Sequence, residues 1–168
     1  MSGFFVIYNS DGQPVDDDLL RQVTTELGQR YPDGTTYKSS GHIGFCFSKF
    51  IDTNDVRDFQ QPHRTQEGWL IVGDVRLTER TALRHKLSQA DLPANAADIE
   101  YVIAAYRQWG EKCLDHLRGD FAFVIWDSDR LFVAHDHFAV IPIYYVQIGQ
   151  TWLISNDQRA ILEYDSFD

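Results

Sequence analysis

Few residues in this sequence have both the type and the spacing for chemistry. His135 and His137 flank Asp136, and imidazoles together with a carboxylate can hold a zinc ion. The three residues fall in a predicted strand, so we interpret the histidines as structural or surface residues and predict no metal site. The chain has no Gly-x-Ser-x-Gly motif, and the Gly-His-Ile-Gly sequence at residues 41–44 is too short for a phosphate-binding loop.

The two cysteines, Cys46 and Cys113, stand far apart in the chain and in apolar surroundings. Two cysteines at this spacing indicate neither a disulfide framework nor a metal-binding pair. We therefore predict two buried free thiols, since an unpaired cysteine behaves as a small apolar residue.

Composition limits the partners and the compartment. The chain has 168 residues, most simply one domain over residues 1–168, and a formal net charge of -10. Nucleic acids and anionic membranes would repel such a chain, so we expect neither as a partner. The apolar run at residues 4–8 is too short for a signal peptide or a membrane span, and we expect a cytoplasmic location.

The first half of the chain mixes strands with one clear helix. Aromatic and β-branched runs predict buried strands at residues 4–8, 42–51 and 69–72. A helix is predicted to begin at Asp16–Asp18 and to end near Gly28, with Leu19, Leu20, Val23 and Leu27 at helical spacing. The polar residues 52–67 show no periodicity and are interpreted as a long loop.

The second half begins with helices and ends with hairpins. Short helical segments are predicted at residues 81–87 and 114–117, and a longer helix runs from Asp98 to a stop at Gly110. Two hairpins follow, pairing residues 121–126 with 131–134 and residues 143–148 with 151–155. Helices and hairpins in separate blocks predict an α+β fold with largely antiparallel sheets.

Several motifs in the second half occur together in one known family. Residues 117–127 read Leu-Arg-Gly-Asp-Phe-Ala-Phe-Val-Ile-Trp-Asp, residues 134–145 contain Ala-His-Asp and Pro-Ile-Tyr-Tyr, and residues 155–162 begin Ser-Asn-Asp. Upstream lie Arg-Tyr-Pro-Asp at residues 30–33 and the Gln61–Pro62 pair. In order and spacing, over nearly the whole chain, this set resembles the N-terminal glutamine amidotransferase domain of asparagine synthetases.

The resemblance implies both a fold and relatives. The fold would be the N-terminal-nucleophile hydrolase sandwich, a four-layer αββα arrangement with two mainly antiparallel sheets between helices. The relatives would be class II glutamine amidotransferases. Some members of the wider group, such as lasso-peptide cyclases, have an N-terminal domain of this type that has lost its activity.

The resemblance also implies a nucleophile position at Ser2. In the family this residue is a cysteine that becomes the first residue when Met1 is removed, and its free α-amine acts as the base. Ser2 is small enough to permit removal of Met1. A hydroxyl is much less acidic than a thiol, however, and therefore needs stronger support from its surroundings.

The family's oxyanion hole corresponds to Val72 and Gly73. The family has an asparagine side chain at the first position and uses the backbone N–H of the glycine at the second. Val72 has no side-chain donor, so only the Gly73 backbone remains, and losing one oxyanion donor costs about 10²–10³ in rate. Together, Ser2 and Val72 predict a degenerate site.

Two further residues align with the family's glutamine-binding groups. Asp98 matches the acid that pairs with the α-ammonium, although it is equally suited to be the N-cap of its own helix. Lys49 aligns with the arginine that grips the α-carboxylate, and a lysine is a poorer bidentate partner.

The expected function is therefore a domain without glutaminase activity. It would serve as a structural or docking partner for an ATP-dependent, amide-bond-forming synthetase, as part of the same chain or as a separate protein, or it would self-associate. No cofactor is expected. Two alternatives stay open: an active Ser2 amidohydrolase that releases ammonia from glutamine or a small amide, and a binding module that senses an amino acid.

Overall fold

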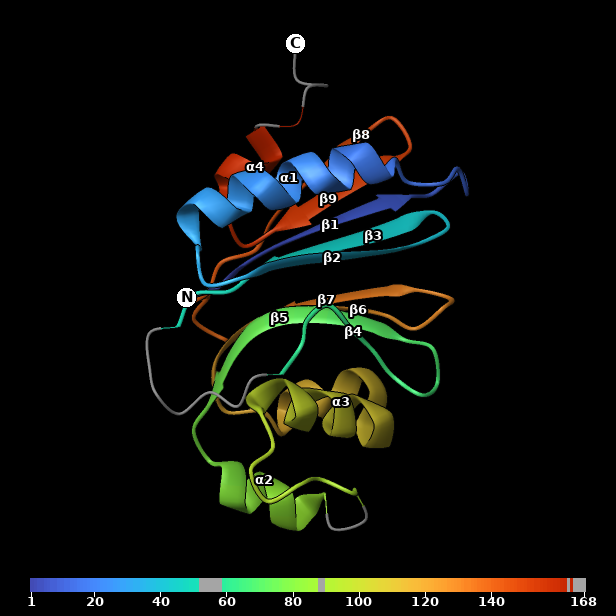
Figure 1. Cartoon of the computed structure of the whole chain (residues 1–168). Coiled ribbons are helices and arrows are strands. Elements are labelled where there is room, and N and C mark those ends of the chain that lie inside the picture. Colours follow the sequence, from blue (N-terminus) through green and yellow to red (C-terminus); the bar gives the residue numbers. More distant parts are fainter. Residues whose placement is uncertain (52–58, 88–89, 163, 165–168) are drawn as a thin grey trace.

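Two β-sheets stacked face to face, with helices on both outer sides, form the computed structural model (Figure 1). The structure describes residues 1–51, 59–87, 90–162 and 164. Helices α1 (Asp17–Arg30) and α4 (Gln158–Leu162) cover one sheet, whereas α3 (Asp98–Trp109) covers the other, with α2 (Arg80–Lys86) beyond it. The expected four-layer αββα sandwich is confirmed. No helix among the described residues is both long and apolar enough to cross a membrane.

The sheet under α1 has five strands with β1 at its centre. Its order is β2 (Thr35–Ser40), β3 (Ile43–Ser48), β1 (Gly3–Asn9), β9 (Thr151–Ser155) and β8 (Tyr144–Ile148). Strand β1 runs antiparallel to both neighbours. Residues Gly3 to Ile7 are all buried, because one face of β1 packs on the second sheet and the other on α1. This two-sided burial accounts for the unbroken apolar run near the start of the sequence.

The second sheet packs under the first. Its order is β4 (His63–Arg64), β5 (Leu70–Leu77), β6 (Gly119–Trp126) and β7 (Leu131–His135), all antiparallel. Alternate residues of β5 face opposite sides, so Leu70 and Val72 pack between the sheets while Ile71 packs toward α3. The 3-10 helix η1 (Gly110–Asp115) follows α3 directly.

Most predicted elements are present, with corrections at their ends. Both hairpins are confirmed as β6–β7 and β8–β9. Helix α1 ends at Arg30, two residues beyond the predicted end near Gly28. A Cβ on Gly28 would lie 2.7 Å from Thr35 Cγ2, which means that the glycine permits close helix–sheet packing. The second helical segment ends at Asp115, two residues before Leu117.

Strand β2 was not expected from the sequence, because its six residues are polar apart from Tyr37 and largely exposed. It forms as the edge strand beside β3, whose backbone groups pair with it along its whole length. The predicted loop at residues 52–67 contains the short strand β4, which pairs with β5. Residues 52–58 of that segment lie outside the described residues.

Asp136 organises the connection between β7 and β8. Its carboxylate is 3% exposed and accepts backbone N–H groups from Phe138 at 2.9 Å and Val140 at 3.1 Å, with longer contacts from Ile141 and Phe121. Burial alone would raise the pKa of this carboxyl, but the backbone donors outweigh it and hold the pKa below its ordinary value. The ionised side chain therefore stabilises the folded connection.

Replacing Asp136 with asparagine should destabilise the fold at pH 7 by roughly 3 kcal/mol, because an amide cannot accept all of these bonds. The folded pKa lies below the unfolded one, so the carboxylate's contribution is complete above about pH 4 and is lost as the pH falls through the folded pKa. Urea unfolding at several pH values should show the wild type and Asp136→Asn converging in acid. The control Asp129→Asn, on an exposed turn, should match the wild type throughout; a pH-independent deficit for Asp136→Asn would contradict the assignment.

Candidate functional site

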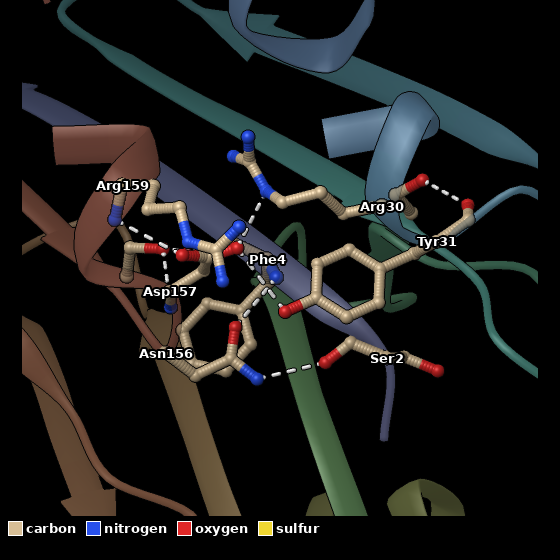
Figure 2. Close-up of polar contacts among 9 residues, drawn as sticks. Ser2, Phe4, Arg30, Tyr31, Asn156, Asp157 and Arg159 are labelled. Atoms are coloured by element: carbon tan, nitrogen blue, oxygen red, sulfur yellow. Dashed lines mark hydrogen bonds and ion pairs between the residues drawn. The ribbon is translucent and has the colours of Figure 1, made fainter. Parts of the chain in front are cut away.

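Ser2 is held in place by the strand that follows it and by Asn156. The Asn156 side chain donates to the Ser2 carbonyl oxygen at 2.7 Å and accepts the Phe4 N–H at 2.8 Å (Figure 2). These two bonds extend the pairing of β1 with β9 beyond its last register pair, Phe5 with Ser155. Ser2 is 9% exposed. The two bonds of the Asn156 side chain fix the backbone of Ser2 and Phe4 beside the end of β9.

Asp157 ties the end of α1 to the same region. It accepts from Arg30 Nε at 2.7 Å and from the Tyr31 hydroxyl at 3.2 Å (Figure 2). Burial, followed by the charge of Asp157, raises the pKa of Tyr31 to about 12, so the hydroxyl remains a donor. A Cβ on Gly3 would lie 2.3 Å from the Tyr31 ring, and only glycine allows the ring to pack on β1 there.

The reactive atoms of Ser2 face polar neighbours. The Ser2 backbone nitrogen donates to Asp74 Oδ2 at 3.1 Å, and the Phe50 N–H donates to Ser2 Oγ at 3.2 Å. While Met1 is attached, the Ser2 nitrogen is a peptide nitrogen and cannot act as a base. An α-amine exposed at this position would lie beside a carboxylate, which favours the charged ammonium that cannot accept the hydroxyl proton.

The positions aligned with the oxyanion donors have other partners. Val72 is fully buried among apolar residues between the two sheets. The Gly73 N–H donates to Gln61 Oε1 at 2.8 Å. A Cβ on Gly73 would lie 2.6 Å from the Ala122 carbonyl oxygen, so the close approach of β5 to β6 requires glycine here. Gln61 stood out in the sequence only as part of a Gln-Pro pair, without a role.

A cavity of about 330 Å³ opens beside Ser2. Its lining brings together four residues singled out from the sequence, which are Ser2, Lys49, Gly73 and Asp98. Val72 does not line it, and its side chain packs in the core between the two sheets. Arg76 and Arg80 also line the cavity and were not predicted, since nothing in their local sequence marks them as site residues.

Asp98 does not cap its own helix, so the N-cap interpretation is wrong. Ala97 is the N-cap residue of α3, and the Glu100 side chain accepts its N–H at 2.7 Å. Asp98 instead accepts the Leu77 N–H at 3.0 Å and pairs with Arg80, whose Nε lies 2.7 Å from Oδ1. Burial raises the pKa of Asp98, although the Leu77 N–H and Arg80 oppose this shift.

The remaining chemical candidates do not line the cavity. Cys46 and Cys113 are free and buried as predicted, and burial raises their pKa to about 12 and about 11. His135 Nδ1 lies 2.7 Å from the Asp136 carbonyl oxygen. Within the described part of the chain, no cluster of three histidine, cysteine or acidic residues is placed to hold a metal ion.

Comparison with known proteins identifies a family that matches the whole chain. The glutamine amidotransferase domain family matches residues 1–168. Asparagine synthetase [glutamine-hydrolyzing] 1 of Bacillus subtilis (strain 168) is 28% identical over 170 residues, covering 96% of this chain and 27% of that protein. Asparagine synthetase [glutamine-hydrolyzing] 3 of the same strain is 30% identical over 149 residues, covering 85% and 24%. The chain thus spans about a quarter of the length of these relatives.

Solved structures share the architecture. Glutamine phosphoribosylpyrophosphate amidotransferase of B. subtilis, complexed with ADP and GMP, superimposes with a TM-score of 0.75 over 95% of this chain and 42% of that one. The identity is 16%, so this likeness concerns the fold. The fold is the N-terminal-nucleophile hydrolase sandwich that the sequence motifs implied.

Replacing Ala97 with serine should stabilise the protein by about 1 kcal/mol, because a serine at the N-cap adds the side-chain acceptor that α3 lacks. Urea unfolding at pH 7 measures the change. The matched control is Ala82→Ser, in the exposed part of α2, which should slightly destabilise the fold, since serine is a poorer helix former than alanine. Equal effects at both positions would contradict the capping geometry.

Proposed function

Because the chain belongs to the glutamine amidotransferase domain family found in asparagine synthetases, we propose that it is an amidotransferase-type domain that does not hydrolyse glutamine. It serves instead as a docking domain for an ATP-dependent synthetase that forms amide bonds. The observation that carries this proposal is the bonding of the Gly73 N–H to Gln61.

Glutamine hydrolysis passes through a tetrahedral oxyanion that needs donors placed in advance. At the two aligned positions, Val72 has an apolar side chain in the inter-sheet core and the Gly73 N–H already has the Gln61 carboxamide as its partner. An incoming oxyanion would have to displace Gln61 and would still lack the second donor. The nucleophile is weaker as well, because Ser2 has a hydroxyl where the family has the thiol of a cysteine.

An apolar groove that shares no lining residue with the Ser2 cavity supports the docking role. It has a volume of about 470 Å³ and lies along β7 and β8, the edge strands of the two sheets. Tyr145 is 69% exposed there, and Phe138 in the preceding connection is 85% exposed. The groove is lined by Tyr8, Leu131, Val133, His135, Ile143, Tyr145, Trp152 and Ile154. Exposed apolar surface of this kind marks protein interaction sites.

The choice of a synthetase as partner rests on the relatives. In the two Bacillus asparagine synthetases, about three quarters of the length lies outside the matched region. A second copy of this chain is the less favourable occupant, because each copy has a net charge of -10. Docking of this kind is independent of catalysis at Ser2, so the domain can keep it after the glutaminase chemistry is gone.

An active Ser2 hydrolase is the alternative, and one contact favours it. The Phe50 N–H lies 3.2 Å from Ser2 Oγ, so a backbone donor is present at the nucleophile position. Such an enzyme requires removal of Met1. Intact-mass spectrometry of the purified protein tests that requirement, and retained Met1 removes this alternative.

The purified protein should release no ammonia from L-glutamine above the level of the Ser2→Ala control. Ser2→Cys should also stay inactive, because the thiol restores the nucleophile but leaves Val72 and the Gln61 contact unchanged. Adding Val72→Asn to Ser2→Cys should not restore glutaminase activity either, because the side chain at position 72 lies between the sheets and the Gly73 N–H is still bonded to Gln61. Circular dichroism checks that each variant folds. Ammonia release by the wild type that Ser2→Ala abolishes would overturn the proposal.

The groove should bind the protein's ATP-dependent synthetase. Replacing Tyr145 with aspartate should lower the affinity between the two purified proteins at least about tenfold, because the substitution places a charge in a contact that excludes water. The loss of affinity is observed as weaker co-elution. Gln22→Asp, on the exposed face of α1, is the matched control and should leave binding unchanged. Equal binding by wild type and Tyr145→Asp would exclude the groove as the docking surface.

A further inference from the structure

Arg80 makes an unusual contact inside the Ser2 cavity. It is the first residue of α2 and lines the cavity with its guanidinium group beside Asp98. Its Nε lies 2.7 Å from Asp98 Oδ1 and its Nη2 donates to Oδ2 at 3.0 Å. The Asp98 side chain is only 9% exposed, whereas that of Arg80 is 47% exposed. The protein therefore supplies its own cation to the buried carboxylate of this cavity.

Both carboxylate oxygens of Asp98 already have protein partners. Oδ2 accepts the Leu77 N–H and Arg80 Nη2, and Oδ1 lies 2.7 Å from Arg80 Nε. The charge of Asp98 is therefore matched by the Arg80 guanidinium. A second cation brought by a ligand would gain little from this carboxylate.

The charges around the cavity disfavour an additional cation. Among its described lining residues, Lys49, Arg76 and Arg80 are basic, and Asp74 and Asp98 are acidic, which makes three basic side chains against two acidic ones. An α-ammonium near Asp98 would lie next to the Arg80 guanidinium, and like charges at such distances repel. A ligand with a carboxylate or an uncharged polar end meets no such repulsion.

We propose that Arg80 determines the ligand class of this cavity, which takes a small carboxylate or carboxamide without an α-ammonium and discriminates against a free amino acid such as glutamine. The inference rests on the proposed function, because it treats the cavity as a ligand site that no longer processes glutamine. Arg80 acts through Asp98 by occupying the position that a ligand's ammonium would take.

The test uses two ligands that differ only in the amino group, L-glutamine and its des-amino analogue glutaramate. Isothermal titration calorimetry measures the affinity of each for the wild type and for Arg80→Gln, which keeps side-chain length and donors but removes the charge. The wild type should bind glutaramate at least about tenfold more tightly than glutamine, as expected from one additional like-charge contact. Arg80→Gln should abolish or reverse that preference.

Two further variants control the measurement. Arg80→Lys keeps the positive charge and should keep the wild-type preference. Arg107→Ala removes a different half-exposed arginine, paired with Glu67, and should leave both affinities unchanged. Since Arg80 is half exposed, the fold is expected to tolerate its replacement, and circular dichroism checks this for each variant.

Three results would overturn the inference. They are equal or tighter binding of glutamine by the wild type, an unchanged preference in Arg80→Gln, and no binding of either ligand at millimolar concentration to either protein. None of these results bears on the docking role, which is tested separately by co-elution of the wild type and of Tyr145→Asp with the synthetase. Conversely, loss of the docking role would leave the ligand preference at Arg80 unaffected.

Discussion

The position of β1 at the centre of its sheet is the constraint on which the rest of the site depends. Its residues are buried on both faces, by the second sheet on one side and by α1 on the other. Since β1 is paired along both edges, its first residues cannot shift without breaking two ladders. Asn156 continues this pairing to Ser2 through its side chain. The nucleophile position is thus set by sheet formation itself.

The same packing decides which groups of β5 meet Ser2. Val72 and Asp74 lie on the face directed at the first sheet, and Gly73 lies on the opposite face. A valine at position 72 adds apolar contact between the sheets, whereas a polar side chain there would be a buried donor in need of a partner. Valine at this position therefore contributes to the packing between the two sheets.

The polar groups of the cavity are paired with other groups of the protein. Gln61 accepts the Gly73 N–H, and Arg80 pairs with Asp98. In each case a protein side chain occupies a group that the resemblance assigns to the substrate or to the oxyanion. Buried polar groups are costly without partners, so these internal contacts contribute to the stability of the fold.

Local patterns in the sequence predicted the elements well where the pattern reflects burial. The apolar periodicity of α1 and α3 and the continuous apolar run of β6 indicated their positions, because those side chains face a core. Strand β2 could not be predicted in this way, since it is largely exposed and depends on pairing with β3. The interpretation of Asp98 as an N-cap failed because a carboxylate at a helix start can also accept from another element, here Leu77.

The sequence by itself determined the family, the kinds of elements and four of the residues that line the cavity, because motifs and periodicity are local properties. Only the tertiary structure decided which polar groups meet. Asn156 and Ser2 are 154 positions apart, and the contacts of Gln61 with Gly73 and of Arg80 with Asp98 each join different elements. A hydrogen bond requires two groups within about 3 Å and in good alignment, and spacing along a chain sets neither.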